Sequence, residues 1–433
     1  MAFRVQSIYR HRGWVSLLLT AMLLVACYLW ENVPLAYGES FDRLYFAERY
    51  IQKHFGQNKT VSDGLFINVS YDKAIAEIDL YDMNGLFTGK VDITDRETLD
   101  RLLERLEEDN TYRYIFLDVR FEKGIQTPVD SSLFHRIARM RDIVIDTHRD
   151  MELASPLLEP KACISDYKTT ITSTGFTRYQ FLQKGKESVA LKMYEDLTGE
   201  DIRQWGKSPV FFSAGALCHN SLFIRIPEDF SENLVDVHLD GDGDGATGIH
   251  RQRYFDCGPQ IDEDFPLAEE AEGKIVVIGD FVNDVAGTYM GEQPNPYLAF
   301  LAEESLMGGK HKVSLWYVFI LAVLFYLTFL AMLSKKGTSA VLALFDALLQ
   351  WFRKKLGKVK EKDPQEPRIS WLNALLWNFF GFSISTFVIC IILFRVFDMT
   401  FSIFIPSLVF SAVAAVTQTW EHLDKQKKED EKV

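Results

Sequence analysis

Apolar residues are concentrated in four runs that enclose one long region of mixed composition. The first run covers residues 14–30, and the other three cover residues 313–333, 369–394 and 399–420. The last three runs carry no charged residue, and a helix of about 20 residues crosses the hydrocarbon layer of a bilayer. The pattern therefore predicts four transmembrane helices around residues 31–312, and buried helices of a soluble protein are the alternative.

The N-terminal apolar run has two interpretations. Three arginines precede it and no acidic residue occurs before Glu31, which fits both a retained anchor and a cleaved signal peptide. The sequence LVAC, ending at Cys27, also resembles the cleavage site of a bacterial lipoprotein, in which the cysteine is acylated. The apolar run continues through Trp30, which favours an uncleaved anchor. Both interpretations place the following segment outside the cytoplasm.

The distribution of charge predicts the topology. The chain carries −13 at pH 7, and because the segments outside residues 31–312 carry +7, that region carries −20. Positively charged segments remain in the cytoplasm. We therefore expect residues 1–13, 334–368 and 421–433 to lie on the cytoplasmic side of a bacterial inner membrane, with residues 31–312 extracytoplasmic. An acidic domain is a poor partner for nucleic acid, whose phosphates require clustered Lys and Arg.

Short apolar runs alternate with amphipathic helical patterns throughout the acidic region. This alternation predicts an α/β domain with a mixed, mainly parallel sheet covered by helices. Residues 227–272 are rich in Asp, Glu and Gly, which predicts surface loops. The expected strands are residues 65–69, 74–80, 114–119, 142–147, 209–212, 221–226 and 274–279, and the expected helices are residues 39–55, 96–108, 131–140, 187–197 and 295–307.

Four aspartates stand at the carboxyl ends of expected strands: Asp79, Asp118, Asp146 and Asp280. Ligands of open α/β sheets bind in the crevice at those ends. Carboxylates that come together there raise one another's pKa unless a cation balances them. The pattern therefore predicts a pocket for a cation or an amine-bearing ligand, which His148 would join. Helix capping and loop solvation are the alternative.

A second acidic segment resembles the start of a calcium-binding loop. Asp240, Asp242 and Asp244 alternate with glycines, but Arg251 stands where such a loop has its bidentate glutamate. The two interpretations are a Ca²⁺ site and a solvated acidic turn; no other cofactor is expected. No GxSxG, HExxH or phosphate-binding glycine loop occurs, so no catalytic residue is predicted. Three cysteines of the acidic region allow at most one internal disulfide: Cys163, Cys218 and Cys257.

In its order of features, the chain resembles the CHASE domain of type two, an extracellular sensory module of bacterial cyclases and histidine kinases. The resemblance rests on a strand ending in ID at residues 78–79, on residues 115–121 (IFLDVRF) and on residues 272–279 (EGKIVVIG). Asp284 and Thr288 then stand where that family has its Asp and Thr-Pro. The resemblance covers nearly the whole chain and implies an extracytoplasmic ligand-binding domain, with Asp284 among its site residues.

Three stretches depart from the family pattern. Residues 85–89 (GLFTG) replace its Trp-Pro-x-x-Arg stretch, and residues 300–302 (FLA) replace its His-Ala-Asn. Tyr289 follows Thr288 where the family has Pro. Only 13 residues follow Trp420, fewer than the ~50 of a small domain, so we expect no kinase or cyclase output in this chain.

These features predict a membrane-anchored sensor with three kinds of partner. The partners are the lipid bilayer, a small ligand or envelope protein outside, and a separate signalling protein in the cytoplasm. Residues 340–356 combine an apolar helical face with a basic end, which is typical of a helix on the bilayer surface or docked to a partner. A structural or assembly protein of the bacterial envelope is the second interpretation, and an enzyme is the third. The sequence assigns neither the ligand nor the oligomeric state.

Overall fold

The computed structural model divides the chain into two compact units, which are described separately. The first unit comprises Met1–Ala47 and Val313–Val433, and the second, the central domain, comprises Glu48–Lys312. The structure describes residues 11–32, 63–77, 89–148, 151–165, 178–183, 185–226, 254–260, 265–288, 291–334, 371–397 and 399–430.

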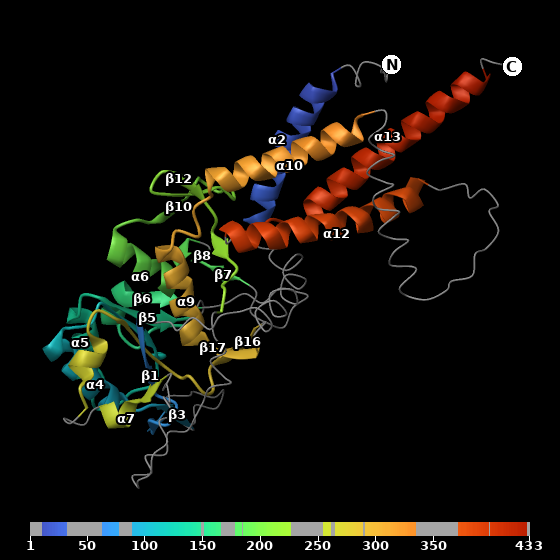
Figure 1. Cartoon of the computed structure of the whole chain (residues 1–433). Helices are drawn as coiled ribbons and strands as arrows, with labels where there is room; N and C mark the ends of the chain where they lie inside the picture. Colours follow the sequence, from blue (N-terminus) through green and yellow to red (C-terminus); the bar gives the residue numbers. More distant parts are fainter. Residues whose placement is uncertain are drawn as a thin grey trace, which may run out of the picture. The chain divides into compact units, whose positions relative to one another are not determined.

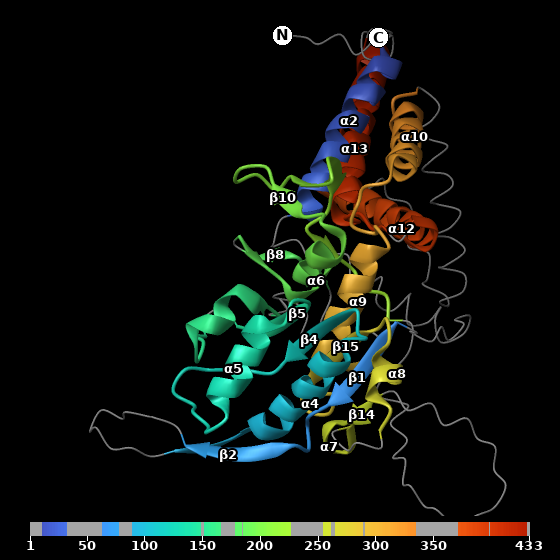
Figure 2. The same cartoon turned by 90° about the vertical axis from the view of Figure 1, so that its left-hand side faces the viewer.

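A six-stranded parallel sheet forms the centre of the central domain (Figures 1 and 2). Its strands are β1 (Gly64–Asn68), β4 (Tyr114–Asp118), β5 (Ile143–Thr147), β6 (Ala162–Ile164), β14 (Phe255–Asp256) and β15 (Ile275–Gly279). The strand order is β14-β1-β15-β4-β5-β6, and every pair is parallel. The inner strands are buried apolar runs, as parallel sheets between helices require. The predicted α/β class is therefore confirmed.

The position of β15 determines which strand ends meet. Although β15 is the last of the six strands in the chain, it lies between β1 and β4, where Val276 is level with Leu65 and Ile115. The carboxyl ends of β1, β15, β4 and β5 consequently form one continuous edge. The residues at that edge come from segments far apart in the sequence, among them Asn68 and Asp118.

One face of the sheet is covered by α4 (Arg96–Asp109) and α5 (Asp130–Arg139). Asp95 begins α4 by accepting a hydrogen bond from the Glu97 amide at 3.1 Å, and Asn110 ends it in the left-handed conformation. The leucines of α4 lie at helical spacing and pack on alternate residues of the strands. Fully burying each such side chain contributes about 1.5–3 kcal/mol.

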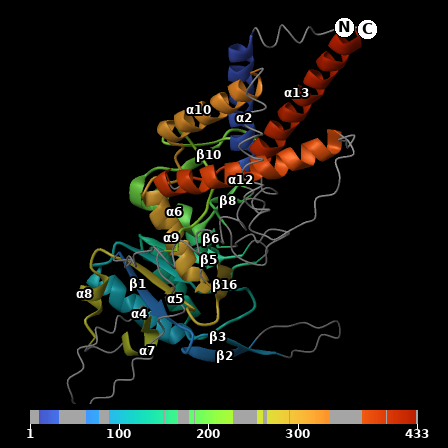
Figure 3. The ribbon, with the colours of Figure 1, turned by 45° about the vertical axis from the view of Figure 1, so that its right-hand side comes forward.

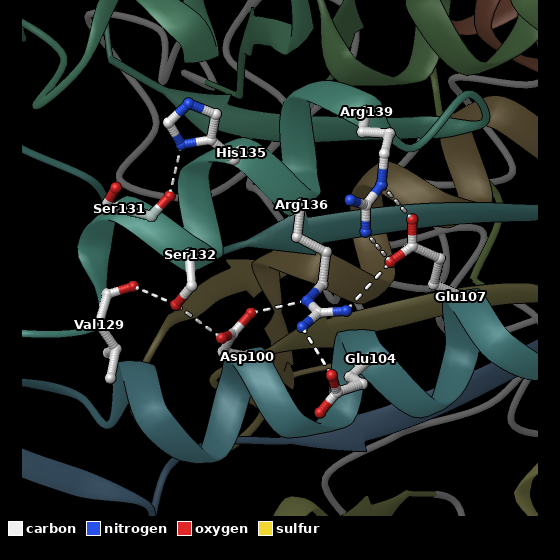
Figure 4. Close-up of polar contacts among 9 residues, drawn as sticks. All are labelled: Asp100, Glu104, Glu107, Val129, Ser131, Ser132, His135, Arg136 and Arg139. Atoms are coloured by element: carbon white, nitrogen blue, oxygen red, sulfur yellow. Dashed lines mark hydrogen bonds and ion pairs between the residues drawn. The ribbon is translucent and has the colours of Figure 1, made fainter.

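An ion-pair network joins α4 to α5 at the surface (Figure 4). Arg136 of α5 contacts Asp100 at 2.7 Å, and Glu104 and Glu107 at 3.0 Å. Arg139 adds a second contact to Glu107 at 2.6 Å. Because one guanidinium is shared among three carboxylates and is only 14% exposed, the network holds the two helices together better than isolated surface pairs would.

Arg96 anchors the start of α4 from inside the domain. Its side chain is 1% exposed and donates to Asp130 at 2.7 Å and to the Ile125 carbonyl at 3.2 Å. The guanidinium lies 5.5 Å from the ring centroid of Phe121 and 5.8 Å from that of Phe134. A planar, permanently charged group next to two aromatic rings gains cation–π attraction in addition to its ion pair.

The opposite face of the sheet packs on α6 (Val189–Thr198) and α9 (Asn295–Met307). Phe66 of β1 meets Tyr297 and Phe300 of α9 edge to face, with ring centroids 5.6 and 5.2 Å apart. Buried helices on both faces produce a three-layer arrangement, which is visible in Figure 1. This second face also carries the polar residues of the sheet edge.

Small antiparallel sheets lie outside the main sheet. Of the strand expected at residues 74–80, the described part lies in β2 (Lys73–Glu77), and residues 78–80 are outside the described residues. β2 pairs antiparallel with β3 (Lys90–Thr94) and takes no part in the parallel sheet, contrary to the mainly parallel arrangement expected (Figures 2 and 3). The remaining sheets are β10 (Ile202–Gln204) with β11 (Phe211–Ser213) and β12 (Ala216–Cys218), β7 (Tyr179–Gln180) with β13 (Ser221–Leu222), β8 (Leu182–Gln183) with β9 (Lys186–Glu187), and β16 (Val285–Thr288) with β17 (Gly291–Pro294).

Short elements occur where loops were expected. Within residues 227–272 the structure contains β14 and two short helices, which the local composition did not indicate. These helices are α7 (Cys257–Gln260) and α8 (Leu267–Ala271). Elsewhere in the domain, a 3-10 helix, η2 (Pro156–Lys161), precedes β6. Cys257 and Leu267 are fully buried in the core shared with α4, so these segments close one side of the domain.

In its described residues, the first unit contains four helices: α2 (Arg12–Glu31), α10 (Leu315–Met332), α12 (Trp371–Phe397) and α13 (Phe404–Asp430). Three segments in the described part of the chain are long and apolar enough to cross a membrane, namely Arg12–Glu31, Leu315–Met332 and Asn378–Phe397. The apolar part of α13, Phe404–Trp420, is shorter. Three of the four predicted spans are therefore supported, and Arg395, expected in a turn, lies inside α12.

Helix contacts within this unit are mainly aromatic. The ring of Phe410 lies 5.6 Å from Phe325 and 5.0 Å from Phe329, measured between centroids. Thr386 and Ser407 share a hydrogen bond of 2.8 Å between α12 and α13. Hydroxyl pairs of this kind satisfy polar groups between helices in an apolar surrounding.

The cysteines form no disulfide. All five are free thiols with buried side chains, so the single bridge that the sequence allowed is not present. Cys27 lies inside α2, which continues without a break to Glu31.

Candidate functional site

Two predicted aspartates are neighbours at the carboxyl edge of the parallel sheet. Leu117 is level with Ile145 in the pairing of β4 with β5, so Asp118 is level with Asp146. Leu117 and Ile145 belong to the core under α4 and α5. Because side chains alternate along a strand, both aspartates point to the opposite face, that of α6 and α9.

The two carboxyl groups hydrogen-bond to each other. Burial, together with the charges of Asp146 and Asp284, raises the pKa of Asp118 well above its ordinary value. Burial also raises the pKa of Asp146, but hydrogen bonds from Ser165 and Asp118 oppose that effect. The hydrogen bond raises the pKa of Asp118 and lowers that of Asp146, so the two carboxyl groups act on each other in opposite directions.

A glycine makes the close approach at this edge possible. A Cβ atom on Gly279 would lie 2.7 Å from Cγ of Pro296 and 3.0 Å from Cβ of Asp118. Both separations are shorter than normal carbon contacts, so any larger residue would displace the aspartate or the start of α9. Gly279 thus brings β15, β4 and the first turn of α9 together beside the carboxyl pair.

Three further side chains surround the pair. Ser165, directly after β6, donates its hydroxyl to Asp146. His148 lies near enough for its charge to lower the pKa of Asp146, against the larger effect of burial. Burial raises the pKa of Tyr179, and the charges of Asp146 and Asp118 raise it further.

Asp284 contributes charge to the site and structure to its own loop. Its carboxylate accepts a hydrogen bond of 2.6 Å from the Asn295 side chain, and its carbonyl accepts one of 2.8 Å from the Asn295 amide. These bonds fix the turn that leads into α9. The negative charge is also one cause of the raised pKa of Asp118, so the structure brings Asp118, Asp146 and Asp284 into one electrostatic group.

Asp280 is engaged in a different set of contacts. Its carboxylate accepts hydrogen bonds from Ser70 at 2.5 Å and from the Asn283 amide at 2.7 Å, and Lys73 lies 3.5 Å away. Burial raises the pKa of Asp280, but the hydrogen bonds outweigh burial and lower that pKa to about 2. Asp280 therefore stabilises the turn after β15 as a permanently charged acceptor.

The other predicted site residues lie outside the described residues. Asp79 is one of them, and β2, which ends before it at Glu77, is not a strand of the parallel sheet. The proposed calcium segment, Asp240, Asp242 and Asp244, is also outside them. Among the residues that the structure describes, no group of three or more His, Cys, Asp or Glu side chains could hold a metal ion.

An open pocket of about 800 Å³ lies at the carboxyl ends of β5 and β6. Thr147 and His148 line it on one side and Ile164 on another, so the pocket adjoins the segment that carries Asp146. Cationic and anionic side chains both contribute to the wall: Lys123, Lys186, Glu152, Glu159 and Glu187. Pockets of 300–1,000 Å³ are usual for small ligands.

Ser165 and Tyr179 are site residues that the sequence did not indicate. Ser165 follows a three-residue strand, β6, too short to show a period of two. Tyr179 lies in a region where no regular pattern of apolar residues occurs. One signal for Ser165 was present in the sequence: it follows a short apolar run, ACI at residues 162–164. The predicted aspartates likewise stand at the carboxyl ends of apolar runs.

Comparison with known proteins identifies no relative: no family model, no curated protein and no solved structure matches the chain. The resemblance to the CHASE domain of type two thus stays a prediction from residues 115–121 and 272–279. In the structure, these two segments contribute β4 and β15, the adjacent strands on either side of the contact between Gly279 and Asp118.

Proposed function

We propose that the chain is a membrane-anchored sensor whose central domain binds an amine-bearing ligand at Asp118 and Asp146. The observation that carries the proposal is the pair of buried carboxyl groups, level with each other at the carboxyl edge of a parallel sheet, where burial raises the pKa of both. In this proposal the two carboxyl groups share one proton when no ligand is bound, and a protonated amine supplies the positive charge in place of that proton. Its binding lets both carboxyls ionise, so the ligand exchanges for a proton.

The neighbouring pocket supports a small polar ligand. Its wall carries Lys123 and Lys186 as well as three glutamates, so it offers partners for both positive and negative groups. Specificity in such a site comes from a few polar groups that fix the orientation of the ligand. An amine placed on the carboxyl pair would leave the remainder of the ligand to the pocket beside His148.

The apolar helices on both sides of the domain support a role in signalling across a membrane. The central domain is joined in sequence to α2 on one side and α10 on the other, both long and apolar enough to span. A ligand shifts the equilibrium between two conformational states of such a protein only when it binds one state better than the other. The resemblance to sensory domains of type two supports the same role, with a separate cytoplasmic protein as its partner.

Thermal unfolding of the detergent-solubilised full chain tests the binding step. We expect small primary amines, from ethanolamine to spermidine, to raise the Tm of the wild type in a concentration-dependent way. Asp118→Asn and Asp146→Asn remove the response, whereas Asp109→Asn, at an exposed carboxyl on α4, retains it. The proposal fails if no amine raises the Tm, or if the two site variants respond as the control does. A stable complex captured by crosslinking without any amine response would favour the envelope-assembly function instead.

A further inference from the structure

The three-stranded sheet β10–β12 has one face that is largely buried and an opposite face with exposed apolar side chains. Ile202 and Phe211 are each 4% exposed and Ser213 is 1% exposed, so these residues face the domain interior. On the alternate positions, Trp205 is 70% exposed and Phe212 37% exposed. An exposed face with two large aromatic side chains is unusual for a sheet of this size, because exposed faces are normally polar.

The pairing of the strands places these aromatic residues on the same face. Phe212 is level with Arg203 on one side and with Leu217 on the other. The Trp205 amide donates a hydrogen bond of 2.8 Å to the Val210 carbonyl, which continues the pairing one step beyond β10. Residues directly opposite each other share a face, so the exposed surface is formed by Arg203, Trp205, Val210, Phe212 and Leu217. We call it the Trp205 face.

This sheet is fixed to the segment that enters α10. Cys218 of β12 forms an antiparallel bridge with Lys312, and the His219 amide donates to the His311 carbonyl at 2.8 Å. Lys312 also pairs with Glu200 at 2.6 Å, just before β10. The apolar helix begins at Leu315, only three residues later. Three residues of chain span at most ~10 Å, so covalent geometry alone keeps β12 close to the start of this span.

From this connection we propose that the Trp205 face lies in the headgroup layer of the bilayer that α10 crosses. Tryptophan is enriched at that depth because its ring is apolar and its N–H is polar. Lys207, in the turn, and Arg203, which pairs with Asp201, place cationic groups at the rim, where anionic lipid attracts them. The occupant of the face is therefore lipid. The proposal rests on α10 as a membrane span and is independent of amine binding.

Site-directed spin labelling of the full chain in nanodiscs of phosphatidylcholine and phosphatidylglycerol tests this placement. Trp205→Cys and Phe212→Cys carry the label, and the unsubstituted chain reports the background because its five cysteines are buried. Ile75→Cys is the matched control, since Ile75 is an apolar side chain, 69% exposed, on β2. Relaxation by molecular oxygen measures access from lipid, and relaxation by a water-soluble nickel chelate measures access from water.

We expect oxygen to relax the labels at positions 205 and 212 more strongly than the nickel chelate does, with the opposite order at position 75. The proposal would be overturned if the same reagent gave the stronger relaxation at all three positions. Protection from both reagents at position 205 would also overturn it, in favour of a protein contact such as a second copy of the chain. If the cysteine variants do not fold, tryptophan fluorescence provides the test. Brominated lipid must then quench the tryptophan fluorescence of the wild type more strongly than that of Trp205→Phe.

Discussion

A buried acid in α9 provides the sharpest test of the electrostatics of the central domain. Glu303 is 1% exposed, and its Oε1 atom has no hydrogen-bond partner among the described residues. Burial raises the pKa of Glu303 to about 8, with Arg113 opposing the effect and Glu304 adding to it. A glutamate in this environment is protonated at neutral pH, and its ionisation opposes folding.

The size of the effect follows from the two pKa values. Each tenfold change in proton affinity is worth about 1.4 kcal/mol, so a change from 4.5 to about 8 corresponds to about 4–5 kcal/mol. Because the pKa is higher in the folded state, the contribution of Glu303 to stability is greatest below pH 4.5 and is lost as the pH rises through about 8. Glu303→Gln, which has no charge to bury, should lack this loss.

Thermal unfolding of the full chain in detergent between pH 5 and pH 9 measures the difference. We expect Glu303→Gln to match the wild type at pH 5 and to exceed it by about 8 °C or more at pH 9, at about 2–4 °C per kcal/mol. Glu108→Gln, at an exposed position of α4, is the control and should follow the wild type throughout. Parallel curves for the wild type and Glu303→Gln would refute the reasoning.

Three other substitutions test separate features. Arg96→Met should lower the free energy of unfolding by about 3–5 kcal/mol, because it leaves Asp130 without its buried cation. Gly279→Ala should cost about 1–3 kcal/mol, since its Cβ would meet Pro296 at 2.7 Å. Asp280→Asn should cost about 2 kcal/mol at pH 7, from a pKa lowered from 3.8 to about 2, and that cost should shrink as the pH falls through about 2. Urea unfolding of the solubilised chain measures all three.

Matched substitutions separate these effects from general damage. Arg101→Met removes an exposed pair with Glu97 on the same helix and should change stability by less than about 1 kcal/mol. If Arg96→Met lowered the free energy of unfolding by no more than Arg101→Met does, the importance of its buried ion pair would be contradicted. Gly279→Ala without loss would show that the strand edge relaxes freely. For Asp280→Asn, a cost that is unchanged at low pH would contradict the hydrogen-bonded, ionised carboxylate.

The local pattern of apolar residues was sufficient to predict helices whose ends are marked by characteristic residues. The helix expected at residues 295–307 is α9 with the same bounds, because a proline begins it and Gly308 follows it. Residues 96–108 likewise became α4, whose leucines show the helical period. The order of the sheet did not follow from local pattern. Placing β15 between β1 and β4 depends on contacts across some 200 residues, such as Val276 with Leu65.

The candidate site was predictable only in part for the same reason. Asp118 and Asp146 lie at the carboxyl ends of consecutive strands, which usually pair, so their meeting could be expected from sequence. Asp280 also follows a strand of this edge, but its own turn and Ser70 occupy its carboxylate. Whether a carboxylate accepts hydrogen bonds from its own turn depends on the backbone geometry of that turn. The alternation of apolar residues along the chain does not encode this geometry.

Infrared difference spectroscopy of the carboxyl groups tests the proposed exchange of a proton for an amine most directly. At neutral pH, we expect the full chain to show the C=O stretch of a protonated carboxyl that Asp118→Asn removes. Saturation with the best amine of the panel should abolish the same band in the wild type, while the band of Glu303 persists. A band that is unchanged by every amine, or that remains in Asp118→Asn, would contradict the proposed site.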